Sequence, residues 1–193
     1  NNIKCQTCHM PQLADPIIIA NGYINLAART PFNQHVFAGA NHFMIDLIKN
    51  NKVALDVNVS DNQFDSTLSA TMRLLQQESV EFELTSDSIT SDTAYYHVRI
   101  RNKAGHKFPS GYPSRRTVVQ FVVLDAVSDT IFRSGIFDQD FRVVGETPQW
   151  EPHHNVIRED NVSQIYEMVM GDVNGQFTSI EERAAIMLKD NRI

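Results

Sequence analysis

Apolar residues recur every three or four positions in two early segments of this 193-residue chain. Residues 41–50 and 62–78 both show this spacing, which predicts two amphipathic helices. Good N-cap residues precede them: Asn41 before the first, and Ser60 or Asp61 before the second. Residues 1–34 have no such stripe, and prolines and an Asn-Gly pair interrupt them, so we expect irregular structure there.

The pattern changes to period two after residue 79. Apolar and polar residues alternate over 80–84 and 96–100, and 117–124 is largely a run of apolar and β-branched residues. Together with the short apolar pair 131–132, these segments predict four strands separated by turns. Four such strands are typical of a small antiparallel β-sandwich, which we expect over residues 80–145.

The last part of the chain, residues 146–193, is predicted to be an irregular and helical tail that packs on the sandwich. Helices are expected over about 162–170 and about 179–189, with Thr178 as the N-cap of the second. The fold class is therefore predicted to be α+β. It would comprise a short helical N-terminal part over residues 1–79, the antiparallel β-sandwich and the helical C-terminal tail.

Composition narrows the classes of function. The chain is 42% hydrophobic and 21% charged, as in ordinary globular proteins. Its formal charge of −6 argues against nucleic acid and against anionic membrane surfaces as partners, because both require a basic face. The longest apolar run is 17–20, so we expect no membrane span.

The candidate chemistry lies in the pentapeptide Cys5-Gln6-Thr7-Cys8-His9, which holds the only two cysteines. In a C-x-x-C-H sequence both thiols add across the vinyl groups of a haem, and the histidine binds the iron. We therefore expect one covalent haem c, with His9 as proximal ligand. The alternatives are a zinc ion completed by scattered histidines, or a disulfide. Haem attachment of this kind predicts a periplasmic, cell-surface or extracellular bacterial protein.

The second axial ligand is predicted to be His106 or else His35. Both lie in loops, and glycine and proline fix the backbone around His106. Most methionines fall on predicted helix faces, where core packing is the usual role. Arg115 and Arg116 are candidates for pairing with the haem propionates, since a guanidinium group matches a carboxylate; the alternative is an exposed strand charge.

Three segments together resemble multihaem c-type cytochromes: Cys5–Pro11, His35–Asn41 and Gly105–Gly111. The match is to bacterial forms in which the last haem-binding segment precedes a β-sandwich, and it extends over most of the chain. The resemblance implies electron transfer. It also implies that isolated histidines bind haems attached elsewhere, so that His35 and His106 can serve two different haems. Since this chain has one attachment site, further haems would lie in another segment or on a partner.

We therefore expect a c-type cytochrome domain that carries electrons through a bis-histidine haem and is not itself an enzyme. The expected partners are other redox proteins or haem-bearing subunits, including assembly into a larger cytochrome complex or filament. Two alternatives remain. The first is a haem enzyme with an open axial site that acts on a small molecule. The second is an interaction module that donates histidines to the haems of a partner.

Overall fold

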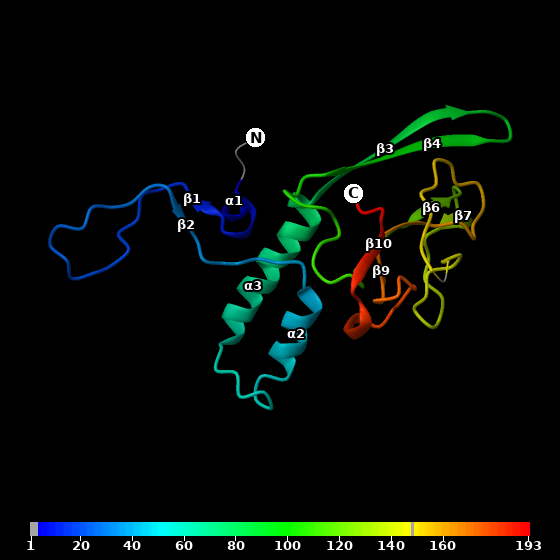
Figure 1. Cartoon of the computed structure of the whole chain (residues 1–193). Helices are drawn as coiled ribbons and strands as arrows, with labels where there is room; N and C mark the ends of the chain where they lie inside the picture. The colour runs from blue at the N-terminus through cyan, green and yellow to red at the C-terminus, as the bar shows by residue number, and fades with distance from the viewer. Residues whose placement is uncertain (1–3, 148) are drawn as a thin grey trace. The chain divides into compact units, whose positions relative to one another are not determined.

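The computed structural model describes residues 4–147 and 149–193 and divides into two compact units, Asn1–Gly105 and His106–Ile193. The sequence predicts three segments, with boundaries after residues 79 and 145. The first unit contains the N-terminal helices and the first two of the predicted strands, which follow those helices along the chain (Figure 1). Within the described residues, every helix is too short or too polar to cross a lipid bilayer.

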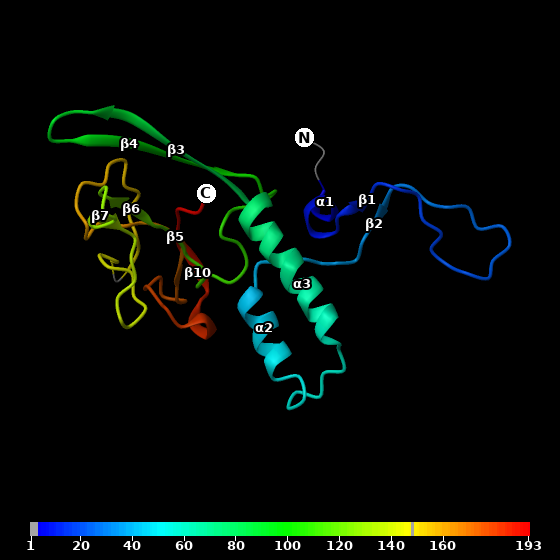
Figure 2. The ribbon, with the colours of Figure 1, turned by 180° about the vertical axis from the view of Figure 1, so that it is seen from behind.

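The first unit begins with the elements that surround the cysteines and continues into a pair of helices. These elements are α1 (Cys5–His9), β1 (Gln12–Leu13), β2 (Phe32–Asn33), α2 (His42–Asn50), α3 (Asp61–Arg73) and a π-helical turn (Leu74–Glu78). Figures 1 and 2 show α2 and α3 side by side. The two helices confirm the prediction from apolar spacing. The short pairing of β1 with β2 was not predicted.

Both predicted helix caps are present. The Asn41 side chain accepts a hydrogen bond from the Met44 backbone N–H at 3.1 Å. Ser60 and Gln63 form a reciprocal capping box at the start of α3. Ion pairs join the two helices and the loop between them, with Lys49 on Asp65 and Lys52 on Asp61. Phe64 and Leu74 are buried, as the apolar spacing of the second helix predicts, whereas Phe43 on α2 is 71% exposed and no residue of α2 is buried.

A long hairpin completes the first unit. Its strands are β3 (Val80–Ile89) and β4 (Ala94–Asn102), which pair antiparallel with Phe82 opposite Ile100 and Leu84 opposite Val98. The two alternating segments of the sequence are thus confirmed as strands. Each is longer than the alternation alone indicated.

The second unit is built from short strands. They are β5 (Thr117–Val119), β6 (Phe121–Leu124), β7 (Thr130–Ser134), β8 (Gln164–Tyr166), β9 (Met168–Gly171) and β10 (Ile186–Asp190), with a 3-10 turn (Glu181–Arg183). The pairs are β5 with β8, β6 with β7, and β9 with β10, all antiparallel. The α+β class and the antiparallel pairing are therefore confirmed. The described strands form separate two-stranded sheets, and the sandwich stays a prediction.

The predicted helical tail is wrong. Strands β8 and β9 lie where the first of these helices was predicted, and the 3-10 turn and β10 lie where the second was predicted. Burial along β9 alternates, with Val169 and Gly171 inside, as expected for a strand rather than a helix. A Cβ atom on Gly171 would lie 2.8 Å from the Leu188 side chain, so the missing side chain lets β10 approach. Pairing between distant segments has overridden the local helical spacing.

Buried polar groups hold the loops of the second unit to its small core. Val143 and Ile165 are buried, and two serines beside them bind backbone carbonyls. Ser134 Oγ donates to Val162 O at 2.6 Å, and Ser163 Oγ donates to Val144 O at 2.8 Å. These bonds satisfy carbonyls that no strand ladder reaches.

Candidate functional site

The C-x-x-C-H pentapeptide forms a single helical turn, α1. Backbone hydrogen bonds from Thr7 N to Lys4 O and from Met10 N to Gln6 O, both 2.9 Å, close it. Residues three apart on a helix lie on the same face, so Cys5 and Cys8 are neighbours on this turn. Cys5 is exposed, Cys8 is half-buried, and no disulfide joins them. The turn therefore presents two unpaired thiols together, as covalent attachment of a haem requires.

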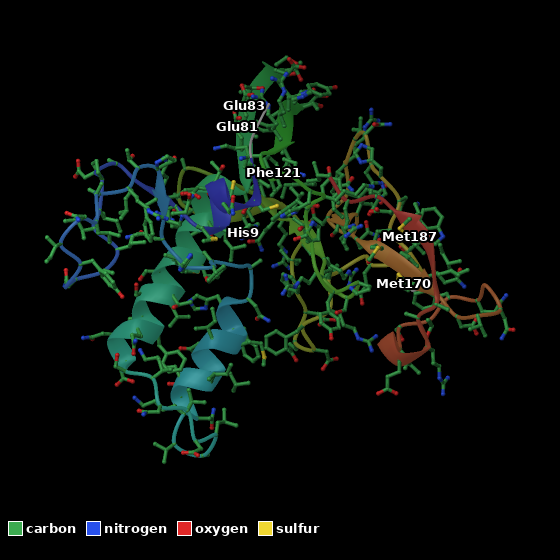
Figure 3. The ribbon with its side chains drawn as sticks, turned by 60° about the vertical axis from the view of Figure 1, so that its left-hand side comes forward. His9, Glu81, Glu83, Phe121, Met170 and Met187 are labelled. Atoms are coloured by element: carbon green, nitrogen blue, oxygen red, sulfur yellow. The ribbon has the colours of Figure 1, made fainter. Side chains whose placement is uncertain are left out.

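The His9 ring is fixed by the backbone of a distant segment. Its Nδ1 atom lies 2.5 Å from the carbonyl oxygen of Ala38, which is almost completely buried. A carbonyl oxygen only accepts hydrogen bonds, so Nδ1 carries a proton, and in the neutral ring the lone pair is then on Nε2. Metal-binding histidines usually have this arrangement, with one ring nitrogen donating to a carbonyl and the other facing the metal. Figure 3 shows His9 on α1, which contacts the π-helical turn after α3.

The segment that carries Ala38 runs antiparallel to the one that follows His9. Ala38 N donates to His9 O at 3.2 Å, and Gln34 N donates to Pro11 O at 2.9 Å. The Asn33 side chain adds a bond to Met10 O at 2.8 Å. This ladder, together with β1 and β2, ties the haem motif to residues 32–38. Residues 1–34 have no apolar periodicity, so the ladder becomes visible only when its pairing partner is known.

His35 lies on that same segment and is exposed. Its ring stacks on Phe37, with centroids 5.6 Å apart and an angle of 11° between the planes, and lies 6.2 Å from the Phe32 ring. Phe37 has a φ of 50°, a left-handed conformation that costs energy for an aromatic residue. The first unit therefore brings Cys5, Cys8, His9 and His35 onto two hydrogen-bonded segments.

His106 is the first residue of the second unit. It is exposed, and its Nδ1 atom lies 3.1 Å from the Lys107 carbonyl oxygen. The loop that follows is held by Arg115, whose guanidinium donates to Ser110 O at 3.0 Å. His106 therefore belongs to a different unit from the two cysteines, His9 and His35. Among the described residues, no three or more His, Cys, Asp or Glu side chains gather as a metal site.

Arg116, a candidate for pairing with haem propionates, lies among carboxylates of its own unit. Each of its three nitrogens faces a carboxylate of its own unit: Glu146 at 2.7 Å, Glu151 at 3.2 Å and Glu167 at 3.1 Å. The Glu151 side chain is only 2% exposed and also accepts hydrogen bonds from Thr147. Because the guanidinium is surrounded in this way, the observed role of Arg116 is to neutralise buried carboxylates.

The three carboxylates around Arg116 are groups that the sequence did not single out. They carry three negative charges against one positive charge, in side chains at most 26% exposed. Burial raises the pKa of the Glu167 carboxyl, and the Arg116 guanidinium opposes that shift only in part. Nothing in the sequence marks these glutamates, because they come from three separate segments that only the fold brings together.

The other histidines lie apart from the C-x-x-C-H turn in sequence and have local surroundings. His42 is half-buried at the start of α2, and His97 is exposed on β4. The His153 ring lies 6.3 Å from the Tyr166 ring, and His154 N donates to Gln164 Oε1 at 2.8 Å. These contacts place His153 and His154 beside strand β8.

Comparison of the chain with models of protein families, with curated proteins and with solved structures finds no match.

Proposed function

We propose that this chain is a c-type cytochrome domain that transfers electrons through one haem attached to Cys5 and Cys8. The observation that carries the proposal is the hydrogen bond from His9 Nδ1 to the Ala38 carbonyl oxygen. It supports Nε2 as the iron-binding atom, and two unpaired thiols stand on the same helical turn. Of the uses of a C-x-x-C pair, haem attachment alone employs both thiols and the adjacent histidine.

The residues of the site would perform three tasks. Cys5 and Cys8 would each form a thioether, with the sulfur bonding to one vinyl carbon and the thiol hydrogen passing to the other. His9 would bind the iron through Nε2, while the Ala38 carbonyl holds the ring in one tautomer and orientation. When bound, haem supplies a one-electron redox centre. A second protein ligand would keep that centre six-coordinate, which favours electron transfer over reaction with a small molecule.

His35 and His106 remain the two candidates for the second ligand. His35 is supported by its place on the segment that binds His9, and by its exposed ring. His106 is supported by a loop that Arg115 and the buried Pro109 hold in place. The multihaem resemblance adds that the two can serve different haems. Removing them one at a time distinguishes these cases.

The large exposed surface area supports the proposal that a cofactor and partner proteins cover part of this chain. The chain exposes 14,213 Å². A folded monomer of 21.9 kDa would expose about 9,300 Å², and two separate globules of half that mass about 11,200 Å². Large apolar side chains of the first unit contribute, with Ile18 60% exposed and Phe37 66% exposed. We therefore propose haem-bearing proteins as partners, in a periplasmic, cell-surface or extracellular location.

The test is to produce the full chain in a host that matures c-type haem and to record its mass after denaturation. We expect the mass of one haem added covalently, and sharp reduced absorption bands that carbon monoxide does not change. A double variant, Cys5→Ala with Cys8→Ala, should lose the added mass. His97→Ala is the matched control, because His97 is an exposed histidine of the same unit.

Three other results would change the proposal. A chain that acquires no haem under these conditions overturns it. A spectrum that shifts with carbon monoxide indicates an open axial site and favours an enzyme. If His35→Ala or His106→Ala creates a carbon monoxide response, that histidine is the second ligand. If neither does, another side chain is the second ligand, and neither His35 nor His106 binds this haem.

A further inference from the structure

The hairpin of β3 and β4 is exposed along almost its whole length. Its strands have ten and nine residues, and no other described strand pairs with either. A two-stranded hairpin by itself is marginally stable in water. A long exposed edge is also a template on which another chain can add a strand. The hairpin therefore has the features of an interaction surface, independently of whether the chain binds haem.

The two faces of the hairpin differ. One face is apolar, with Phe82 54% exposed, Leu84 50% exposed and Val98 opposite Leu84. The other carries two cross-strand ion pairs, Glu81 with Arg101 at 3.2 Å and Glu83 with Arg99 at 3.4 Å. Figure 3 shows Glu81 and Glu83 along β3. Acidic groups thus belong to the β3 edge and basic groups to the β4 edge.

The β3 edge is unsuited to pairing with a second copy of itself. The register of the hairpin shifts between Ser86 and Ser88, so Asp87 is an extra residue that disrupts that edge. In an antiparallel β3–β3 pair centred on Leu84, Glu81 would face Asp87 of the other copy. Like charges directly opposite one another destabilise such a pair.

Pairing of β4 with β3 of a second copy is excluded by size. It would relate the copies by a shift of two strand spacings, about 9.6 Å. The remainder of the first unit outside the hairpin, here called the body of each copy, would then lie at the same end of the sheet in both copies. A compact unit of 105 residues has a radius of gyration of about 13 Å, so the two bodies would collide.

We propose that two copies of the chain associate through β4, around a twofold axis centred on Val98. The four strands then form one antiparallel sheet, and the bodies of the two copies lie at opposite ends of it. Arg99 faces His97 of the other copy, and Arg101 faces Tyr95. An arginine beside a tyrosine ring is favourable, and no two formal charges of the same sign lie opposite one another at neutral pH. The apolar faces join into one continuous surface.

Two substitutions that introduce opposite charges at Tyr95 test the register of the pair. Tyr95→Arg places an arginine opposite Arg101 twice in the dimer, and we expect the dissociation constant to rise about tenfold. Tyr95→Glu places a carboxylate there, and we expect the dimer to be retained or tightened. Ser88→Arg is the matched control, because Ser88 is the cross-strand neighbour of Tyr95 on the β3 edge. Sedimentation of the full chain at several concentrations measures all four proteins.

A covalent probe sharpens the test. Val98 lies opposite its own copy, and residues directly opposite in an antiparallel pair have Cα atoms about 4.5–5.5 Å apart, which suits a disulfide. Val98→Cys should therefore cross-link two chains through residue 98, as peptide mass mapping would show. A chain that stays monomeric at about 100 μM, with slow amide exchange in β4, overturns the proposal. So does a dimer that responds equally to Tyr95→Arg, Tyr95→Glu and Ser88→Arg.

Discussion

The helices α2 and α3 and the C-terminal strands β9 and β10 carry similar spacings of apolar residues, yet only the first pair is helical. The difference lies at the segment ends. Asn41 and the Ser60 capping box satisfy the backbone N–H groups that begin each helix. Thr178 caps only a short turn, because Ala185 N is already bound to Gly171 O at 2.8 Å. Local signals build the helices, and distant partners build the strands.

The polar contacts of the two regions also differ, because those around the helices join neighbouring elements and those of the second unit join distant segments. Around the helices, Lys49 pairs with Asp65 across neighbouring elements. In the second unit, Asn191 joins segments far apart in the chain, donating to Glu151 O at 3.0 Å and to Ile165 O at 3.1 Å. Changes to the second unit should therefore cost more stability than changes to the helix ends.

The largest effect is expected from Arg116→Ala. It leaves the carboxylates of Glu146, Glu151 and Glu167 without their shared cation in a mostly buried position. Removal of one partner from a buried ion pair costs about 3 kcal/mol. Urea unfolding of the full chain measures it, in parallel with Arg101→Ala, whose ion pair is 60% and 49% exposed. Equal losses for the two variants would contradict the distinction between the units.

Two carboxylates of the second unit are expected to change the free energy of unfolding with pH in opposite directions, and the first of them is Glu167. Burial raises the pKa of Glu167, so its contribution is full below its unfolded pKa and is lost as pH rises through the raised folded value. Glu167→Gln should therefore flatten the fall in unfolding free energy at rising pH. Glu159→Gln, at an exposed position, serves as the control. Unchanged slopes in both variants would show that Glu167 does not titrate in this way.

Asp190 should act in the opposite direction. Its hydrogen bonds from Arg192, with a further bond from Lys107, hold the pKa of that carboxyl well below its usual range. Its contribution is present above the unfolded pKa and is lost as pH falls towards the folded value. Asp190→Asn should therefore remove stability at neutral pH and weaken the loss in acid. Unfolding of this variant at a series of acid pH values gives the comparison.

A smaller effect is expected at the start of α3. Ser60→Ala removes the side chain that accepts from Gln63 N, and loss of an N-cap typically costs about 1 kcal/mol. Ser69→Ala, at an exposed position inside the same helix, should change stability by only a few tenths of a kcal/mol, because alanine is the better helix former. Thermal unfolding followed by circular dichroism compares the two. A Ser60→Ala loss as large as that of Arg116→Ala would show that the helix end is not a local feature.

The sequence determined the locally encoded parts of this protein. The caps and apolar stripes predicted α2 and α3, the alternation predicted β3 and β4 as strands, and the C-x-x-C-H pentapeptide identified the candidate chemistry. Each of these depends on residues within a few positions of one another, where spacing fixes which side chains share a face.

Only the tertiary structure decided the rest. It replaced the predicted helical tail with β8, β9 and β10, placed the Ala38 carbonyl on His9, and brought three glutamates to Arg116. Each of these outcomes depends on pairing between segments far apart in the chain. The spacing of residues along a sequence does not identify such partners, because backbone pairing and burial in the folded chain determine them.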